Sequence, residues 1–263
     1  LATVSPRGRS GAWVPAFLRG KKTLLRLKGE NMSLAPRLIL PSVALGLSTF
    51  IMQGSESVII VCFNASLLEY GGDIAVGAMT ILTSVMQLAL LPLQGISQGA
   101  QPVISYNYGA GSADRVKQTF RLLLKVCLSY ATVLWLLVML FPRVFAGIFT
   151  PNAELLAFSA WALRLYCAAM FMMGIQLACQ MTFVSTGNTV CSIIVAVVRK
   201  FVLLLPLIYI MPRLVPDAVA GVYLAEPVAD VLAVTFTMIL FSVQFKKAMK
   251  KLEAPGETRE SAD

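Results

Sequence analysis

Five ionisable side chains lie inside long apolar stretches of this sequence, where charge is costly. Glu56, Arg199 and Lys200 are each near the middle of such a stretch, and Glu226 and Asp230 lie in another. An ionisable group at membrane depth is rare and by default suggests a functional site. Glu226 and Asp230 share a helix face, and two close carboxylates repel when both are ionised. We therefore expect Arg199 or Lys200 to pair with Glu56, Glu226 or Asp230.

Glu56 belongs to a polar face on the first of these stretches. With Gln53 at zero on a helix of about 100° per residue, Thr49, Glu56, Ser57 and Asn64 fall within an arc of about 100°. A carboxylate there must be protonated, paired or bound to a cation. We hypothesise that Glu56 binds a proton or Na+, with Gln53 and Asn64 beside it. A structural ion pair is the alternative.

A second polar face runs along the stretch from Thr80 to Gly111. Seven polar residues fall within about 60° of Gln87, while the opposite side is apolar: Thr80, Thr83, Ser84, Gln94, Gln98, Gln101 and Ser105. In lipid, such a row must face other protein or a water-filled cavity. We interpret it as a cavity wall; hydrogen bonds between packed helices are the alternative.

A third face combines amides with soft apolar groups. It lies around Gln176, within about 60° of it: Ala169, Met172, Met173, Cys179, Gln180 and Phe183. Methionine and phenylalanine beside amides suit a site that accepts many apolar shapes. A methionine-rich packing seam explains the same pattern.

These faces need membrane-spanning helices to position them, and the composition predicts such helices. The chain has 263 residues, of which 57% are hydrophobic and 13% charged, and its mean hydropathy is +0.77. These values indicate an all-α integral membrane protein. Six spans are predicted, at about 37–68, 74–105, 116–141, 155–184, 190–211 and 218–245. The chain contains no His, which excludes His-based catalysis and metal ligation, and its five Cys residues lack a metal-binding spacing.

The net charge of +9 comes from basic residues that flank the spans. We divide the chain into a basic arm (1–33), a six-helix transmembrane lobe (34–245) and a basic, then polar tail (246–263). Lys and Arg gather in the arm, in the turn after the second span and in the tail. By the positive-inside rule, both termini are therefore expected in the cytoplasm. We expect a lipid bilayer around the spans and no nucleic-acid partner, because no soluble reading module follows the arm.

Several motifs resemble the multidrug and toxic compound extrusion (MATE) family, in its bacterial multidrug-exporter branch. They occur in the family's order: LGLSTFIMQGSES (45–57), YGGDIAVGAMTI (70–81), PLQGISQGAQPVISYNYGAG (92–111), STGN (185–188) and LAEPVAD (224–230). The resemblance runs from about Lys21 to Phe245. It covers the C-terminal six of the family's twelve helices, so the chain resembles one lobe of a transporter.

The resemblance implies secondary active efflux of organic, often cationic, drug-like compounds. Na+ or H+ would be the coupling ion, no other cofactor is expected, and the missing N-terminal six-helix lobe would be the partner. The protein would lie in the bacterial cytoplasmic membrane. The expected coupling residues are Glu56, Gln53, Asn64, Glu226 and Asp230. The expected substrate cavity is lined by Gln87, Gln94, Gln98, Gln101, Met172, Met173, Gln176, Gln180, Phe183 and Arg199.

One departure from the family and three alternatives stand beside this interpretation. One branch of the family has an acid on the tenth helix, where this chain has Gln176 and Gln180. A lipid-linked-oligosaccharide flippase of related architecture would be expected to show more basic residues along its cavity. A membrane-embedded enzyme would need a nucleophile elbow or an Asp-rich motif, which the sequence lacks. An inactive transporter fragment is the third alternative.

Overall fold

The structure is a computed structural model that describes residues 36–253, with only the backbone given for 36–53, 55 and 189. All regular structure in this range is helical. The helices are α2 (Pro36–Gly109), α3 (Ala113–Leu140), α4 (Pro142–Gly147), α5 (Ala153–Tyr166), η2 (Met170–Met172), α6 (Met173–Ser185), α7 (Thr189–Val197), η3 (Val198–Leu204), α8 (Leu205–Leu214) and α9 (Ala218–Glu253). The described residues fall into two units, 36–54 and 55–253. The description below concerns residues 55–253, called the lobe.

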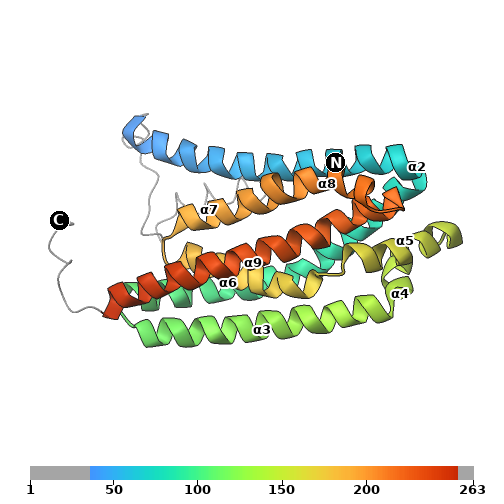
Figure 1. The fold of residues 1–263 in the computed structure, drawn as a ribbon. Coiled ribbons are helices and arrows are strands. Elements are labelled where there is room, and N and C mark those ends of the chain that lie inside the picture. The colour runs from blue at the N-terminus through green and yellow to red at the C-terminus, as the bar shows by residue number, and fades with distance from the viewer. Residues whose placement is uncertain (1–35, 254–263) are drawn as a thin grey trace, which may run out of the picture. The chain divides into compact units, whose positions relative to one another are not determined.

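The helices of the lobe are long and apolar enough to cross a membrane. Four candidates are Glu56–Gly109, Ala113–Leu140, Val190–Leu214 and Ala218–Glu253, and α5 with α6 makes a fifth, bent by 50°. Gly72 divides α2, because its φ of 64° is not helical and only glycine adopts such a φ without strain. The chain turns back at this point (Figure 1). With α2 counted as two passes, the prediction of six membrane-spanning helices is confirmed.

Three of the predicted spans differ from the structure in detail. The fourth, expected to be one helix, is broken between α5 and α6, and the freed carbonyl of Ala168 accepts a hydrogen bond from Trp135 Nε1 at 3.1 Å. The fifth contains the π-helical turn η3. The sixth continues to Glu253, so the first part of the predicted tail is helical.

Two helix starts follow local capping chemistry. Asn152 accepts hydrogen bonds from the backbone N–H groups of Glu154 and Leu155, as expected of an N-cap. Asn188 caps α7 in the same way, after Gly187 with a φ of 76°. Ser112 precedes α3 at the N-cap position, where a serine favours a helix start, but its side chain makes no capping hydrogen bond.

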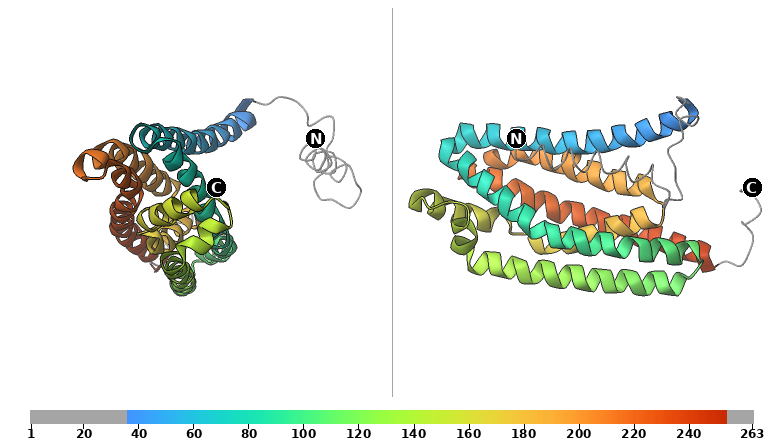
Figure 2. Two further views of the ribbon diagram at one scale, coloured as in Figure 1. Left: turned by 90° about the vertical axis from the view of Figure 1, so that its right-hand side faces the viewer. Right: turned by 180° about the vertical axis from the view of Figure 1, so that it is seen from behind.

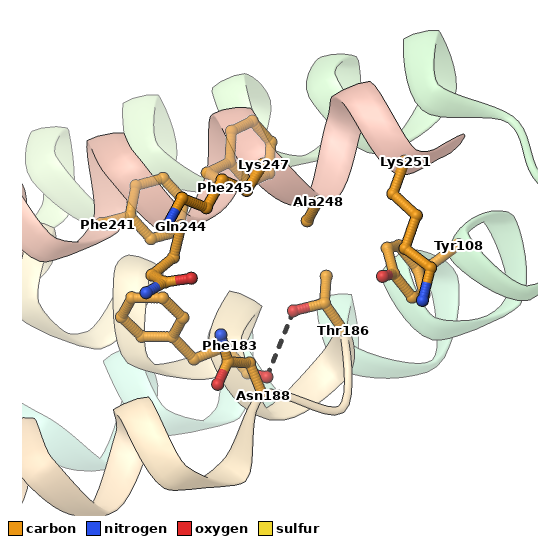
Figure 3. Close-up of a pocket in the computed structure, with 10 residues that line it drawn as sticks. All are labelled: Tyr108, Phe183, Thr186, Asn188, Phe241, Gln244, Phe245, Lys247, Ala248 and Lys251. Atoms are coloured by element: carbon orange, nitrogen blue, oxygen red, sulfur yellow. Dashed lines mark hydrogen bonds between the residues drawn. The ribbon is translucent and has the colours of Figure 1, made fainter. Parts of the chain in front are cut away.

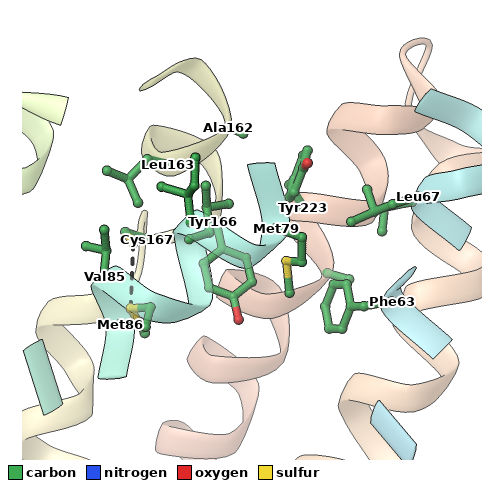
Figure 4. Close-up of a cluster of buried hydrophobic side chains, with 14 of the residues drawn as sticks. Phe63, Leu67, Met79, Val85, Met86, Ala162, Leu163, Tyr166, Cys167 and Tyr223 are labelled. Atoms are coloured by element: carbon green, nitrogen blue, oxygen red, sulfur yellow. Dashed lines mark hydrogen bonds between the residues drawn. The ribbon is translucent and has the colours of Figure 1, made fainter. Parts of the chain in front are cut away.

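The main core lies where α9 crosses the bundle. α9 packs against α8, α5, α6 and η3, and the end-on view in Figure 2 shows it toward one side of the bundle. Phe63, Met79 and Tyr166 are buried there together with Tyr223 (Figure 4). The hydroxyl of the fully buried Tyr223 donates to the carbonyl of Ala75 at 2.8 Å, so its polar end is satisfied.

Two glycines allow helix backbones to approach closely. A Cβ at position 174 would lie 2.6 Å from the carbonyl oxygen of Cys127, where α6 meets α3. A Cβ at position 221 would lie 2.7 Å from the carbonyl oxygen of Met211, where α9 meets α8. Small residues at such crossings are typical of membrane helix packing.

We expect Gly174→Ala to destabilise the lobe by about 1–3 kcal/mol, because the methyl group meets backbone that must shift. Gly99→Ala is the matched control: it is also a helical position, but nothing lies within 4 Å of an added Cβ. Thermal unfolding of the detergent-solubilised chain measures the effect. Equal melting temperatures for the two variants would show that α6 and α3 do not meet as described.

Candidate functional site: a charged cavity inside the lobe

Arg199 in η3 is held between two carboxylates of α9. Its Nε donates to Oδ1 of Asp230 at 2.8 Å, and its Nη2 donates to Oε1 of Glu226 at 2.9 Å. Nη2 also lies 2.7 Å from Oδ1 of Asp230. The Glu226 and Asp230 side chains are only 9% and 3% exposed. Because unpaired buried carboxylates are strongly destabilising, Arg199 is the group that permits their burial.

Lys200, the next residue, pairs with a different helix. Its Nζ donates to Oε1 of Glu56 on α2. Lys200 is 11% exposed and Glu56 is 52% exposed, so this carboxylate remains accessible at the edge of the lobe. The expectation that Arg199 or Lys200 would pair with an acid is confirmed, and both of them do so.

The local backbone directs Arg199 toward α9 and Lys200 toward α2. Val198–Leu204 is π-helical, and the N–H of Leu205 donates to the carbonyl of Lys200, five residues earlier. Pro206 follows immediately, and it has no N–H to give to the carbonyl four residues before it. The widened turn accommodates that lost hydrogen bond. Such turns are frequent at functional sites.

Both ion pairs border one cavity of about 180 Å³. Its charged wall consists of Glu56, Arg199, Lys200 and Glu226. The rest is lined by Ile59, Ile60, Phe63, Met79, Thr83, Met86, Gln87, Leu90, Tyr166, Met173 and Leu204. Five of the predicted site residues therefore meet here: Glu56, Glu226, Arg199, Gln87 and Met173. Asp230 joins them through Arg199.

Other predicted coupling residues do not line this cavity. Asn64 is half-buried elsewhere on α2, and the side chain of Gln53 lies outside the described residues. Among the described residues, no three His, Cys, Asp or Glu side chains lie close enough together to hold a metal ion. The carboxylates of the site are instead separated and bridged by cations.

Apart from Met173, the predicted substrate-cavity residues on η2 and α6 lie away from this site. Phe183 lines a different cavity of about 200 Å³, with Asn188 and residues of α9 (Figure 3). Gln176 is 4% exposed, and its Oε1 has no hydrogen-bond partner in the described part of the chain. Met172 and Gln180 are half-buried and line neither cavity. Within the lobe, these residues do not form a single cavity.

The polar face on α2 borders the charged cavity at Thr83 and Gln87 and is largely exposed beyond it. Gln87, Gln94 and Gln98 are exposed, and Gln101 is half-buried. Ser105 donates to the carbonyl of Ser185 at 3.0 Å, but none of these four amides makes a side-chain hydrogen bond to a described residue. Within the described residues, the amides therefore do not join helices of this lobe, and their assignment to a cavity wall stays a prediction.

Sequence reasoning missed several residues that line the charged cavity. Phe63, Met79, Met86 and Tyr166 form its apolar wall. Phe63 is one residue before Asn64, and Met79 and Met86 are each one residue from the polar stripe. This adjacency to polar residues was the only sequence feature that pointed to them, because ordinary core residues have the same amino-acid types and the same periodicity.

The fold and the site define a polytopic helical membrane protein with an ionic cavity. The chain belongs to the MatE family, whose sequence profile matches residues 47–210. An inward-facing multidrug resistance MATE transporter superposes with a TM-score of 0.79 at 18% identity, covering 89% of this chain and 54% of that one. The MATE multidrug transporter DinF-BH gives a TM-score of 0.77 at 28% identity, covering 95% and 55%.

Two curated relatives match over a shorter length. A FAD transporter of Shewanella oneidensis is 27% identical over 165 residues, which is 63% of this chain and 35% of the relative. An uncharacterized protein of Mycoplasma pneumoniae is 24% identical over 174 residues, or 63% and 32%. The match therefore spans about a third of the curated relatives and about half of the solved transporters, which agrees in extent with a single lobe.

Removing Arg199 should destabilise the lobe more than removing Lys200. Arg199→Met leaves two buried carboxylates uncompensated, and we expect a loss of about 3–5 kcal/mol. Lys200→Met leaves Glu56, which is half-exposed and reaches water, so its effect should be smaller. Thermal unfolding of the purified chain provides the comparison.

The neutral variant Glu226→Gln/Asp230→Asn tests the cause of this loss. Added to Arg199→Met, it should restore much of the lost stability because no buried charge remains. If the three changes together are no more stable than Arg199→Met alone, the loss came from packing of the arginine side chain.

Proposed function

We propose that this chain is one lobe of a secondary active exporter, and that the charged cavity binds the coupling ion, Na+ or H+. Efflux of organic, often cationic, drug-like compounds would require a second six-helix lobe. The family membership and the likeness to solved multidrug transporters support this proposal. The position of the ionisable groups within spanning helices supports it independently.

The observation that carries the proposal is the imbalance of charge at the cavity. Three carboxylates, Glu56, Glu226 and Asp230, are paired with only two cations, Arg199 and Lys200. An excess negative charge in a poorly hydrated site favours uptake of a proton or a cation. Glu56 is the exposed member of the set, so it is the group that an entering ion reaches first.

The size of the cavity separates the ion site from the substrate site. At about 180 Å³, it is smaller than the roughly 300–1,000 Å³ of pockets that hold drug-sized ligands. It suits ions and water. The exposed amides of Gln94 and Gln98 would instead line a larger cavity completed by the second lobe, and Gln87, which lines the ion cavity, would lie between the two. In that arrangement, ion and drug each bias the equilibrium between two states of the transporter.

The charge of the site also bears on the alternative cargoes. The relative named as a FAD transporter raises an anionic dinucleotide as cargo, and a flippase would carry an anionic lipid-linked sugar. Both would need free cationic groups at the substrate cavity. The amide face proposed to line it, from Thr80 to Gly111, carries no Lys or Arg, and Arg199 and Lys200 beside it are engaged by carboxylates. Neutral or cationic cargo is therefore the better match to this lobe.

Glu56→Gln in a complete transporter that carries this lobe tests the proposed coupling site. The variant nearly keeps the volume but removes the charge, so we expect normal folding and drug binding with loss of ion-driven efflux. Glu56→Asp should retain part of the activity. Glu69→Gln, the same change at an exposed position of α2, is the control. Drug transport into vesicles under Na+ or H+ gradients measures the effect.

Each contrary result has a defined meaning. Wild-type transport by Glu56→Gln would place coupling elsewhere, with Glu226 and Asp230 the next candidates. Failure to accumulate folded protein would make Glu56 a structural partner of Lys200.

The chain expressed without a second lobe should insert into the membrane but confer no drug resistance, and robust efflux by a monomer would contradict the two-lobe proposal.

Loop charges lead us to propose that both termini are cytoplasmic in the bacterial inner membrane. Single cysteines at Asp73 and Asn152, both exposed, should react with an impermeant thiol reagent from outside the cell. A cysteine at Ser112 should react only after the cells are opened. External labelling at Ser112 would reverse the proposed orientation.

A further inference from the structure

A basic groove separates the first turns of α3 from the last turns of α9. It has a volume of about 380 Å³. Lys117 and Arg121 come from α3, and Lys246 and Lys250 come from α9. The one acid among the lining residues is Glu253, which forms an ion pair with Lys117 across the groove. Four cations thus face a single carboxylate, and the groove has a strong excess of positive charge.

The floor of the groove is apolar and firmly packed. Phe120 of α3 stacks with Phe241 of α9 at a centroid distance of 4.6 Å and lies 5.3 Å from Phe245. Phe120, Phe245 and Met249 line the groove beneath the cations. A basic rim over an apolar floor fits a ligand that is both anionic and apolar, rather than a fully hydrated ion.

The groove continues onto an apolar surface of α9. Ile239 lies seven residues before Lys246, and Val243 lies seven residues before Lys250, so each pair lies along the same side of the helix. Ile239 is 64% exposed and Val243 is 48% exposed. A ligand whose anionic head sits between the lysines can therefore lay hydrocarbon chains along this surface.

The position of the groove at the helix ends leads us to expect it at the level of the lipid headgroups. Its cations belong to the ends of two membrane-spanning helices, α3 and α9, and the apolar part of each helix lies on the same side of them. Basic pockets between spanning helices at this level bind anionic headgroups. We propose that this groove is a binding site for an anionic phospholipid, with its phosphate held by Lys246, Lys250 and Arg121.

The lysines of α9 provide a matched pair of variants. Lys246 and Lys250 line this groove, whereas Lys247 and Lys251 line the cavity on another side of α9, shown in Figure 3. All four are near the C-terminal end of α9, so the helix dipole favours them similarly. Lys246→Gln/Lys250→Gln and Lys247→Gln/Lys251→Gln change the net charge equally and differ only in which cavity they alter.

The whole chain, purified in detergent, is titrated with phosphatidylglycerol, and bound lipid is counted by native mass spectrometry. We expect saturable binding that Lys246→Gln/Lys250→Gln weakens about 25-fold, at roughly fivefold for each lysine. Lys246→Arg/Lys250→Arg should keep the affinity, and Lys247→Gln/Lys251→Gln should stay within about twofold of it. Phosphatidylcholine with the same acyl chains should bind weakly, and millimolar inorganic phosphate should not displace the lipid.

Three results would overturn the proposal. Equal losses in both glutamine variants would show diffuse attraction to a basic helix end. Equal binding of phosphatidylcholine would remove the role of charge. Displacement by inorganic phosphate would identify a site for free phosphate instead of lipid. Melting temperatures accompany each titration, and the arginine variant tests the site even if the glutamine variant unfolds.

Discussion

The arrangement of the lobe depends on the cost of placing charge in a medium that cannot solvate it. Glu226 and Asp230 are almost completely buried on α9, and Arg199 satisfies both. This one guanidinium fixes the rotation of α9 against η3, since its planar donors reach both carboxylates only in a narrow range of geometries. The neighbouring core around Tyr223 therefore packs on a helix, α9, whose rotation is constrained by the contacts of Arg199.

The π-helical turn η3 allows the Arg199 contacts with α9 to coexist with the ion pair between Lys200 and Glu56. Arg199 and Lys200 are consecutive, yet they contact α9 and α2 respectively. The π-helical turn lies at this point because Pro206 cannot complete the regular hydrogen-bond pattern. Lys200 belongs to this turn and pairs with Glu56, the half-exposed acid of the set. Ion access at Glu56 is therefore linked to the ion pair that joins α2 to η3.

Much of this could be predicted from sequence because membrane physics imposes simple rules. The lengths of the apolar stretches predicted the number of membrane-spanning segments. The rarity of charge at membrane depth predicted that Arg199 or Lys200 would pair with an acid. The break after Tyr166 could not be predicted, since no Gly or Pro marks it and its free carbonyl is satisfied by Trp135 from another helix. The apolar wall of Phe63, Met79 and Met86 was missed because tertiary packing alone distinguishes it from ordinary core.

The same physics explains why the lobe presents unpaired amides. In hydrocarbon, the exposed groups of Gln87, Gln94 and Gln98 would each lack a hydrogen-bond partner. They are stable only against water or a second protein surface, while the cations around Lys246 and Lys250 are stable against headgroups. The two kinds of polar surface therefore require different neighbours. An amide-lined face at membrane depth needs a water-filled cavity, and a basic groove at the helix ends needs the membrane surface.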